Sequence, residues 1–153
     1  MEKDLWQECL HCKNVCCCKE EIAYPLFLTS EERERVEKIL PNGKDFNKKF
    51  PCPFLNNQNL CDVHEIRPVD CRLFPFDMIK IGGDFFWIIW NVRCPITNYK
   101  EKEFEPCLLE FEEKIIPLFK NYLIEYSALK PNGLHGNYSY KILRKINLLK
   151  NYI

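Results

Sequence analysis

The chain has 153 residues, of which 46% are hydrophobic and 29% charged, and its 22 basic and 22 acidic side chains balance. This length suits a single domain, 1–153, and the composition excludes a disordered or collagen-like chain. The balanced charge excludes a general attraction to nucleic acid or membranes, so we expect neither as a partner. The longest apolar run, 85–90, is too short to cross a bilayer, and residues 1–4 lack the basic and apolar segments of a secretory signal. We therefore expect a cytoplasmic protein.

The first third of the chain is expected to consist of loops around one helix. Residues 1–24 place cysteines among charged residues with little apolar periodicity, which predicts a loop. Thr29 or Ser30 can cap a helix over about 30–40, because acidic residues fill its first turn and apolar residues follow at helical spacing. The segment 50–61 returns on itself through a polar stretch, which predicts a small hairpin-like loop with a cysteine at each of its two ends.

The middle of the chain predicts a β-hairpin. Residues 63–73 are expected to form a short helix interrupted at Pro68. Aromatic and β-branched residues predict strands over 76–81 and 85–92, with the turn at 82–84. The aromatic side chains of this hairpin are expected to form its core and to shield part of a metal site from water.

The last part of the chain is expected to be a helical extension, 103–153. Apolar residues recur every three or four positions over 104–126, which predicts a long helix that Pro117 kinks or divides. Ile142 and Ile146 begin the apolar face of a predicted terminal helix. The expected fold is therefore a small α+β domain, low in sheet, with a short hairpin, irregular cysteine-bearing loops and C-terminal helices that cover one side.

Ten cysteines are the most unusual feature of the sequence. Dense thiols in a reducing compartment are typical of metal ligands, and adjacent cysteines pair poorly in disulfides. The two-residue spacing of Cys9 and Cys12 allows one tight turn to bring both thiolates to one ion. Neighbouring side chains of an extended strand point to opposite faces, so the contiguous cysteines 16–18 suit two centres, or one bridged centre. Eight thiolates divide into two sets of four, which leaves Cys107 and one member of 16–18 spare.

An ordered series of motifs accompanies the cysteines. The series is Cys9-x-x-Cys12 followed by Cys16-Cys17, Leu-Thr-Ser-Glu-Glu at 28–32, Cys-Pro-Phe-Leu at 52–55, Cys61, HEIRPVDCRLFPF at 64–76 and Cys-Pro at 94–95. Together these motifs resemble the YkgJ-type cysteine-cluster family, a zinc- or iron-chelating domain. The resemblance covers about residues 9–96, which we expect to be the metal-binding region of the domain.

The resemblance implies a ligand set of eight cysteines. Carried over position by position, the ligands are Cys9, Cys12, Cys16, Cys17, Cys52, Cys61, Cys71 and Cys94. The chain departs from the family pattern in two places, and the first is that three residues instead of two separate Cys12 from the double cysteine, which a third cysteine, Cys18, follows. Which two cysteines of the 16–18 run bind therefore stays open. The family's Cys-Pro-Gly is Cys-Pro-Ile at 94–96.

Cofactor and supporting residues follow from the thiolate chemistry. Zinc, iron and a 4Fe–4S cluster all accept four thiolates, and spacing does not distinguish them. Four thiolates exceed a divalent ion by about two negative charges, so nearby cations should donate hydrogen bonds to the sulfurs. The candidates are Arg67, Arg72 and Arg93. The alternative is that these arginines pair with Glu65, Asp70 or Asp77.

The predicted function is metal chelation, with metal–thiolate bonds supplying much of the folding energy and no reaction assigned. One alternative is an enzyme: an iron–sulfur redox protein, or a protein-modifying enzyme similar to the flagellin lysine N-methylases, which carry a similar cluster. No glycine-rich nucleotide loop supports this alternative. A second alternative is an adaptor that uses a basic C-terminal helix.

Overall fold

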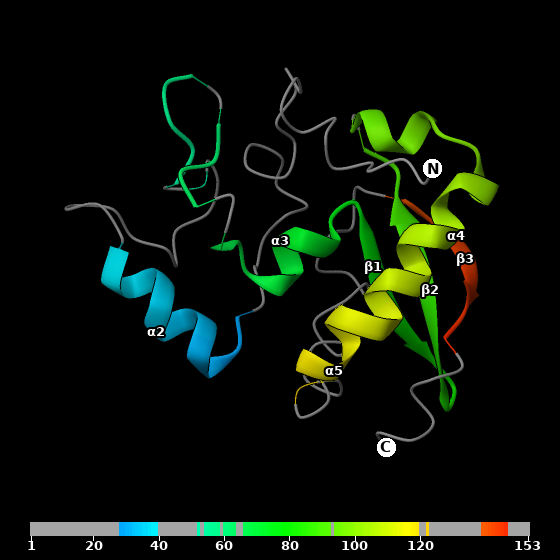
Figure 1. Ribbon diagram of the computed structural model, residues 1–153. Coiled ribbons are helices and arrows are strands. Elements are labelled where there is room, and N and C mark those ends of the chain that lie inside the picture. The colour runs from blue at the N-terminus through cyan, green and yellow to red at the C-terminus, as the bar shows by residue number, and fades with distance from the viewer. Residues whose placement is uncertain are drawn as a thin grey trace.

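The computed structural model describes residues 28–39, 52, 54–58, 60–63, 66–92, 94–119, 122 and 139–146. In this part of the chain, helices lie beside a three-stranded antiparallel sheet, which agrees with the predicted α+β class (Figure 1). None of the helices in these ranges has the length and apolar character needed to cross a bilayer. The predicted loop over 1–24 and residues 147–153 of the predicted terminal helix lie outside the described residues.

The central hairpin forms where the sequence predicts it. Strand β1 (Phe76–Ile81) pairs antiparallel with β2 (Asp84–Trp90), and the innermost pair leaves a two-residue turn. Gly82 has a φ of 64° in this turn, a left-handed conformation that glycine adopts without the steric penalty of a Cβ atom. Asp84, which was expected in the turn, already belongs to β2.

The third strand corrects the predicted terminal helix. Tyr140–Lys145 form β3, which pairs antiparallel with β2 at the edge of the sheet. The helix prediction depended on the four-residue spacing of Ile142 and Ile146, but this spacing places two residues on one face of a helix and of a regular strand alike. Leu143 forms a bulge, because residues 142 and 144 pair with consecutive residues of β2. Ile142 is consequently 47% exposed and Ile146 1% exposed. The predicted helical extension over 103–153 is therefore wrong at 140–145. These residues form a strand because the edge of β2 offers backbone hydrogen-bond partners.

The long predicted helix begins at Glu101 and changes its hydrogen bonding just before Pro117. Helix α4 (Glu101–Glu110) continues into the π-helical turn η5 (Phe111–Ile115) and then into α5 (Ile116–Phe119). Pro117 lacks a backbone N–H and its ring crowds the preceding turn, so a regular α-helical ladder cannot pass through it unchanged. The wider π turn directly precedes this position. Pro117 therefore marks a change of turn type within the helix.

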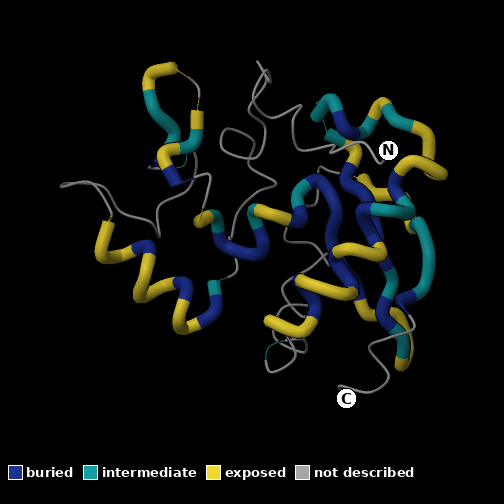
Figure 2. The backbone as a smooth tube through the Cα atoms, in the orientation of Figure 1, coloured by how far each residue is buried: buried dark blue, intermediate teal, exposed yellow. Residues whose placement is uncertain are grey.

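The main core lies between the sheet and the helices α4, η5 and α5. The hairpin contributes Phe76 and Trp87 to this core, and the helices contribute Phe104 and Phe111. The ring centroids of Phe76 and Phe104 lie 5.1 Å apart in an edge-to-face arrangement, and those of Trp87 and Phe111 lie 5.6 Å apart. The opposite face of the hairpin carries a second buried cluster of Ile79, Ile88 and Trp90. Figure 2 shows that buried residues concentrate in β1 and β2. The hairpin aromatics thus form a core, as predicted.

Candidate metal centre

Cys52 and Cys61 belong to a small closed loop, as the sequence predicts. Leu55 and Cys61 form an isolated antiparallel bridge, and the amide of Leu55 donates to the carbonyl of Cys52 at 3.0 Å. The amide of Asp62 donates to the carbonyl of Phe54 at 2.9 Å, which adds a backbone bond to this loop. The side chain of Asn56 donates to the Asp62 carboxylate at 2.9 Å. These bonds hold the two cysteines on adjoining stretches of backbone.

Helix α2 (Ser30–Ile39) supports this loop through a small apolar cluster. Val36 of α2 is buried against Phe54 and Val63, which lie on either side of the loop. Cys52 and Cys61 are half-buried and pack against the same cluster. The other side chains of α2 are mostly exposed, so Val36 and its neighbours fix which face of the helix the loop contacts.

The start of α2 is a capping box. Thr29 precedes the helix, and its Oγ1 accepts a hydrogen bond from the amide of Glu32 at 3.2 Å. The Oε1 of Glu32 accepts in return from the amide of Thr29 at 3.1 Å. These two bonds satisfy two backbone amides at the start of the helix. They explain why α2 begins at residue 30, as the sequence predicts.

Glu32 also reaches a second helix, which the sequence analysis did not foresee. Its Oε2 accepts a hydrogen bond of 2.6 Å from the amide of Val69, the first residue of α3 (Val69–Leu73). Glu32 is only 4% exposed. Cys71 lies half-buried in the middle of α3, while Val69 and Leu73 pack into the main core. The Thr-x-x-Glu pattern signals the cap of α2, but no local pattern signals a partner 37 residues away.

Cys94 and Cys107 differ in their surroundings. Cys94 precedes the 3₁₀ helix η4 (Pro95–Asn98), and its carbonyl accepts from the amide and the hydroxyl of Thr97 at 2.9 Å and 2.7 Å. Cys94 is half-buried at the margin of the main core, whereas Cys107 is buried within it at 5% exposure. Cys107 thus packs as a small apolar side chain, and its assignment as a spare cysteine stays a prediction.

The described part of the chain contains four of the eight predicted ligands. Cys52, Cys61, Cys71 and Cys94 are all half-buried, and no two described cysteines are joined in a disulfide. Among the described residues, no three or more cysteine, histidine or acidic side chains gather closely enough to hold a metal ion. The remaining predicted ligands, Cys9, Cys12, Cys16 and Cys17, lie outside the described residues, as does Cys18. The donors that are described are thiols, which suit zinc and iron.

Two of the three predicted arginine donors are among the described residues. Arg67 is half-buried just before α3, Arg72 within α3 is exposed, and Arg93 lies outside the described residues. Asp77, one of the carboxylates that could pair with these arginines, accepts hydrogen bonds from the amide of Met78 at 2.9 Å and the indole of Trp90 at 3.0 Å. Asp77 therefore has a structural role inside the hairpin.

A partly buried ion pair joins α4 and η5 to β3. The Oε1 of Glu112 accepts from the indole of Trp87 at 3.0 Å and from Nη1 of Arg144 at 2.6 Å. Nε of Arg144 also donates to Glu105 at 3.0 Å. The hydrogen bond to Glu112, followed in importance by that to Glu105, raises the pKa of Arg144 against the opposing effect of burial.

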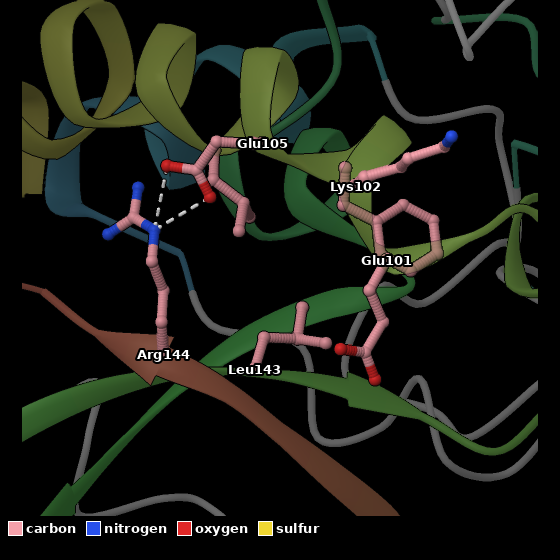
Figure 3. Close-up of a pocket in the computed structure, with 7 residues that line it drawn as sticks. Glu101, Lys102, Glu105, Leu143 and Arg144 are labelled. Carbon is pink, nitrogen blue, oxygen red and sulfur yellow. Dashed lines mark hydrogen bonds and ion pairs between the residues drawn. The ribbon is translucent and has the colours of Figure 1, made fainter.

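A cavity of about 230 Å³ lies beside this ion pair, between α4 and β3. Figure 3 shows Arg144 of β3 and Glu105 of α4 pointing toward each other there. The charged side chains that line the cavity are Glu101, Lys102, Glu105 and Arg144. Two acidic and two basic groups balance, and no cysteine lines the cavity, so it gives neither a strong charge preference nor a thiolate ligand.

The basic residues of β3 are engaged with acidic residues of the body. Lys141 pairs with Glu101, and Lys145 pairs with Asp84 at 3.1 Å. Together with Arg144, every basic residue of this strand therefore has a carboxylate partner. Over 140–145, a strand with paired charges takes the place of the basic helix that the adaptor alternative requires, while residues 147–153 lie outside the described residues.

Comparison with known proteins gives one match. The CxxCxxCC family model, whose description is "Putative zinc- or iron-chelating domain", matches residues 8–95. Neither the search of curated proteins nor that of solved structures found a match to the chain. The matched residues contain all eight predicted ligands and end before α4.

Proposed function

Because the chain belongs to the CxxCxxCC family of zinc- or iron-chelating domains, we propose that it binds its metal through the eight thiolates that the sequence predicts. The proposed ligands are Cys9, Cys12, Cys16, Cys17, Cys52, Cys61, Cys71 and Cys94. The compartment that suits this chemistry is the cytosol, where thiols stay reduced and available to metal.

The observation that carries the proposal is the contrast between the cysteines inside and outside the family match. The four described cysteines within residues 8–95 are all half-buried in loops, at the start of η4 or in a short helix. Cys107, which lies beyond the match, is enclosed in the main core. Partial burial leaves a sulfur accessible to an ion while limiting its contact with water, which is the environment that metal–thiolate bonds need.

The proposed arrangement is two four-thiolate sites, or one bridged site. No three candidate ligands gather within the described part of the chain, so each site would combine described cysteines with those of the segment 9–18. Closing such distant ligands on one ion would tie the start of the chain to the loop at 52–61 and to α3. The metal would therefore contribute directly to folding.

The negative charge of such sites calls for nearby donors. Arg67, Arg72 and Arg93 are the proposed ones. Of the two that are described, Arg67 is half-buried and Arg72 is exposed. A guanidinium that is partly removed from water interacts more strongly with a thiolate, so Arg67 is the better candidate.

Elemental analysis of protein purified without oxygen tests the proposal. We expect about two zinc or iron atoms per chain for two mononuclear sites. A larger iron content with inorganic sulfide and a brown colour would instead select the iron–sulfur alternative. Protein that holds no tightly bound metal and takes up neither Zn²⁺ nor Fe²⁺ after reduction would contradict the proposal.

Cysteine variants test the ligand set. Replacing Cys71 or Cys94 with serine should reduce the bound metal, because a hydroxyl is a much weaker ligand than a thiolate. Cys107→Ala is the matched control and should leave the metal content unchanged, although it removes a buried side chain. Within the 16–18 run, the serine variant that keeps full metal content identifies the spare cysteine. Metal loss in Cys107→Ala equal to that in Cys71→Ser would contradict the assignment.

A further inference from the structure

We propose that Glu32 is a positioning residue for the metal centre: its carboxylate holds the start of α3, and with it Cys71, in a fixed relation to α2 and the loop of Cys52 and Cys61. This inference rests on the proposed metal chelation and extends it to a residue that is not itself a ligand. The decisive contact is the 2.6 Å hydrogen bond from the amide of Val69 to Oε2 of Glu32.

The first step of the argument concerns what α2 supports. Val36 packs against the residues on both sides of the small loop, and Cys52 and Cys61 rest on the same cluster. The position of α2 therefore fixes the backbone of two proposed ligands. The outer face of the helix is exposed (Figure 2), and the buried residues of its inner face are Glu32 and Val36.

The second step concerns α3. Val69 and Leu73 belong to the main core, which anchors this five-residue helix on its inner side. Cys71 lies between them and is half-buried. Figure 1 shows α3 between α2 and the sheet, so a bond from α2 to the first residue of α3 joins the loop cysteines to the element that carries Cys71.

The third step concerns the carboxylate itself. Glu32 is 4% exposed, and its two oxygens have separate tasks: Oε1 accepts from Thr29 within the cap of α2, and Oε2 accepts from Val69. A cap of α2 alone needs only the first bond, and that bond does not require burial of the whole side chain. Glutamine carries an NH₂ donor in place of one of the two oxygens, so one of the two amides loses its acceptor, while alanine accepts neither bond.

The test separates the strength of the α2 cap from the bond between Glu32 and Val69. We compare Glu32→Ala and Glu32→Gln with Thr29→Ala, which removes the hydroxyl that caps α2 but leaves the bond between Glu32 and Val69. The full-length reduced chain is loaded with Zn²⁺ or Co²⁺ as the only metal. The apparent Zn²⁺ dissociation constant is measured by competition with a chromophoric chelator. The thiolate-to-cobalt charge-transfer band reports how many sulfurs bind the ion.

The expected result is a weaker site only where the bond to Val69 is lost. Glu32→Ala should raise the apparent Zn²⁺ dissociation constant about 10- to 100-fold, the range typical of losing a group that orients a ligand. It should also weaken the charge-transfer band by about a quarter at a four-thiolate site, through the loss of Cys71. Glu32→Gln should give an intermediate effect and keeps the size of the side chain in case the alanine variant does not fold. Thr29→Ala should unfold more easily while its metal affinity and cobalt spectrum match the wild type.

Three results would overturn the inference. Wild-type affinity and spectrum in both Glu32 variants would show that the bond to Val69 does not position a ligand. Equal weakening by Thr29→Ala would show that the strength of the α2 cap alone matters. A wild-type chain that takes up neither Zn²⁺ nor Co²⁺ would refute the proposed chelation itself, and with it the role of Glu32.

Discussion

Replacing Arg144 with methionine should destabilise the protein strongly, because it leaves the carboxylate of Glu112 buried without its cationic partner. The side chain of Glu112 is 5% exposed, and Nη1 of Arg144 lies 2.6 Å from its Oε1. After the substitution, the described contact that remains for this oxygen is the 3.0 Å bond from the indole of Trp87. One neutral hydrogen bond does not replace an ion pair inside a core.

The magnitude follows from the burial of the two partners. Removing one member of a buried ion pair costs about 3–5 kcal/mol. Arg144 keeps 27% of its side chain exposed, so water can replace part of its interaction, and we expect about 3 kcal/mol. At about 2–4 °C per kcal/mol for a chain of this size, the melting temperature should fall by about 6–12 °C. Glu112→Gln should cost only about 1–2 kcal/mol, because the amide oxygen still accepts from Trp87 and Arg144 keeps its bond to Glu105.

Urea unfolding of the metal-loaded protein, followed by tryptophan fluorescence, measures both variants. Lys114→Met is the matched control, since it removes an ion pair with Glu110 in which both side chains are at least 60% exposed. Such a pair contributes about 0.5 kcal/mol or less. The reasoning would be refuted if Arg144→Met unfolded within about 0.5 kcal/mol of the wild type, or if Glu112→Gln were the more damaging change.

Three further predictions test other parts of the structure. Gly82→Ala should destabilise the protein by about 1–2 kcal/mol, because the φ of Gly82 is 64°. Gly83→Ala should have little effect, since an added Cβ meets nothing within 4 Å. Chemical denaturation measures both variants. Ile146→Ala should cost about 2–4 kcal/mol and Ile142→Ala less than about 0.5 kcal/mol, whereas a helix with both residues on its apolar face would give similar losses. The pKa of Glu31 is lowered from 4.5, mainly by a hydrogen bond from its own backbone amide and then by one from the hydroxyl of Tyr122. An NMR titration should therefore place the midpoint of Glu31 below 4.5. Its contribution to stability is then present above pH 4.5 and is lost as the pH falls through the lowered pKa; a midpoint at or above 4.5 would contradict these bonds.

Features that depend on neighbouring residues were predictable from the sequence. The start of α2 follows from a Thr-x-x-Glu pattern, and the hairpin turn follows from two consecutive glycines between apolar strands. The closed loop of Cys52 and Cys61 was also anticipated, because its polar tip lies between two short apolar stretches. Each of these signals acts within about ten residues, where the chain has few alternative partners.

Features that depend on distant partners were not predictable. Tyr140–Lys145 become a strand because β2 has a free edge, and an apolar spacing of four residues does not distinguish helix from strand. The bond from Val69 to Glu32 joins residues far apart in sequence. The first turn of α2 contains more than one glutamate, and the sequence does not show which of them reaches a distant amide. The ion pair of Arg144 with Glu112 depends in turn on the unforeseen strand.

The division of the molecule into separate apolar clusters explains why a metal would matter here. The main core, built from the hairpin and the helices α4 to α5, contains many buried aromatic and aliphatic side chains. Among the residues that the structure describes, the cluster under α2 has Val36, Phe54 and Val63 as its buried members, a smaller apolar set than that of the main core. Of the described candidate ligands, Cys52 and Cys61 lie on the small cluster, while Cys71 and Cys94 lie on or beside elements of the main core. Ions bound by cysteines from both groups would join the described part with the smaller apolar cluster to the main core. Metal removal should for this reason loosen α2 and its loop before it affects the sheet.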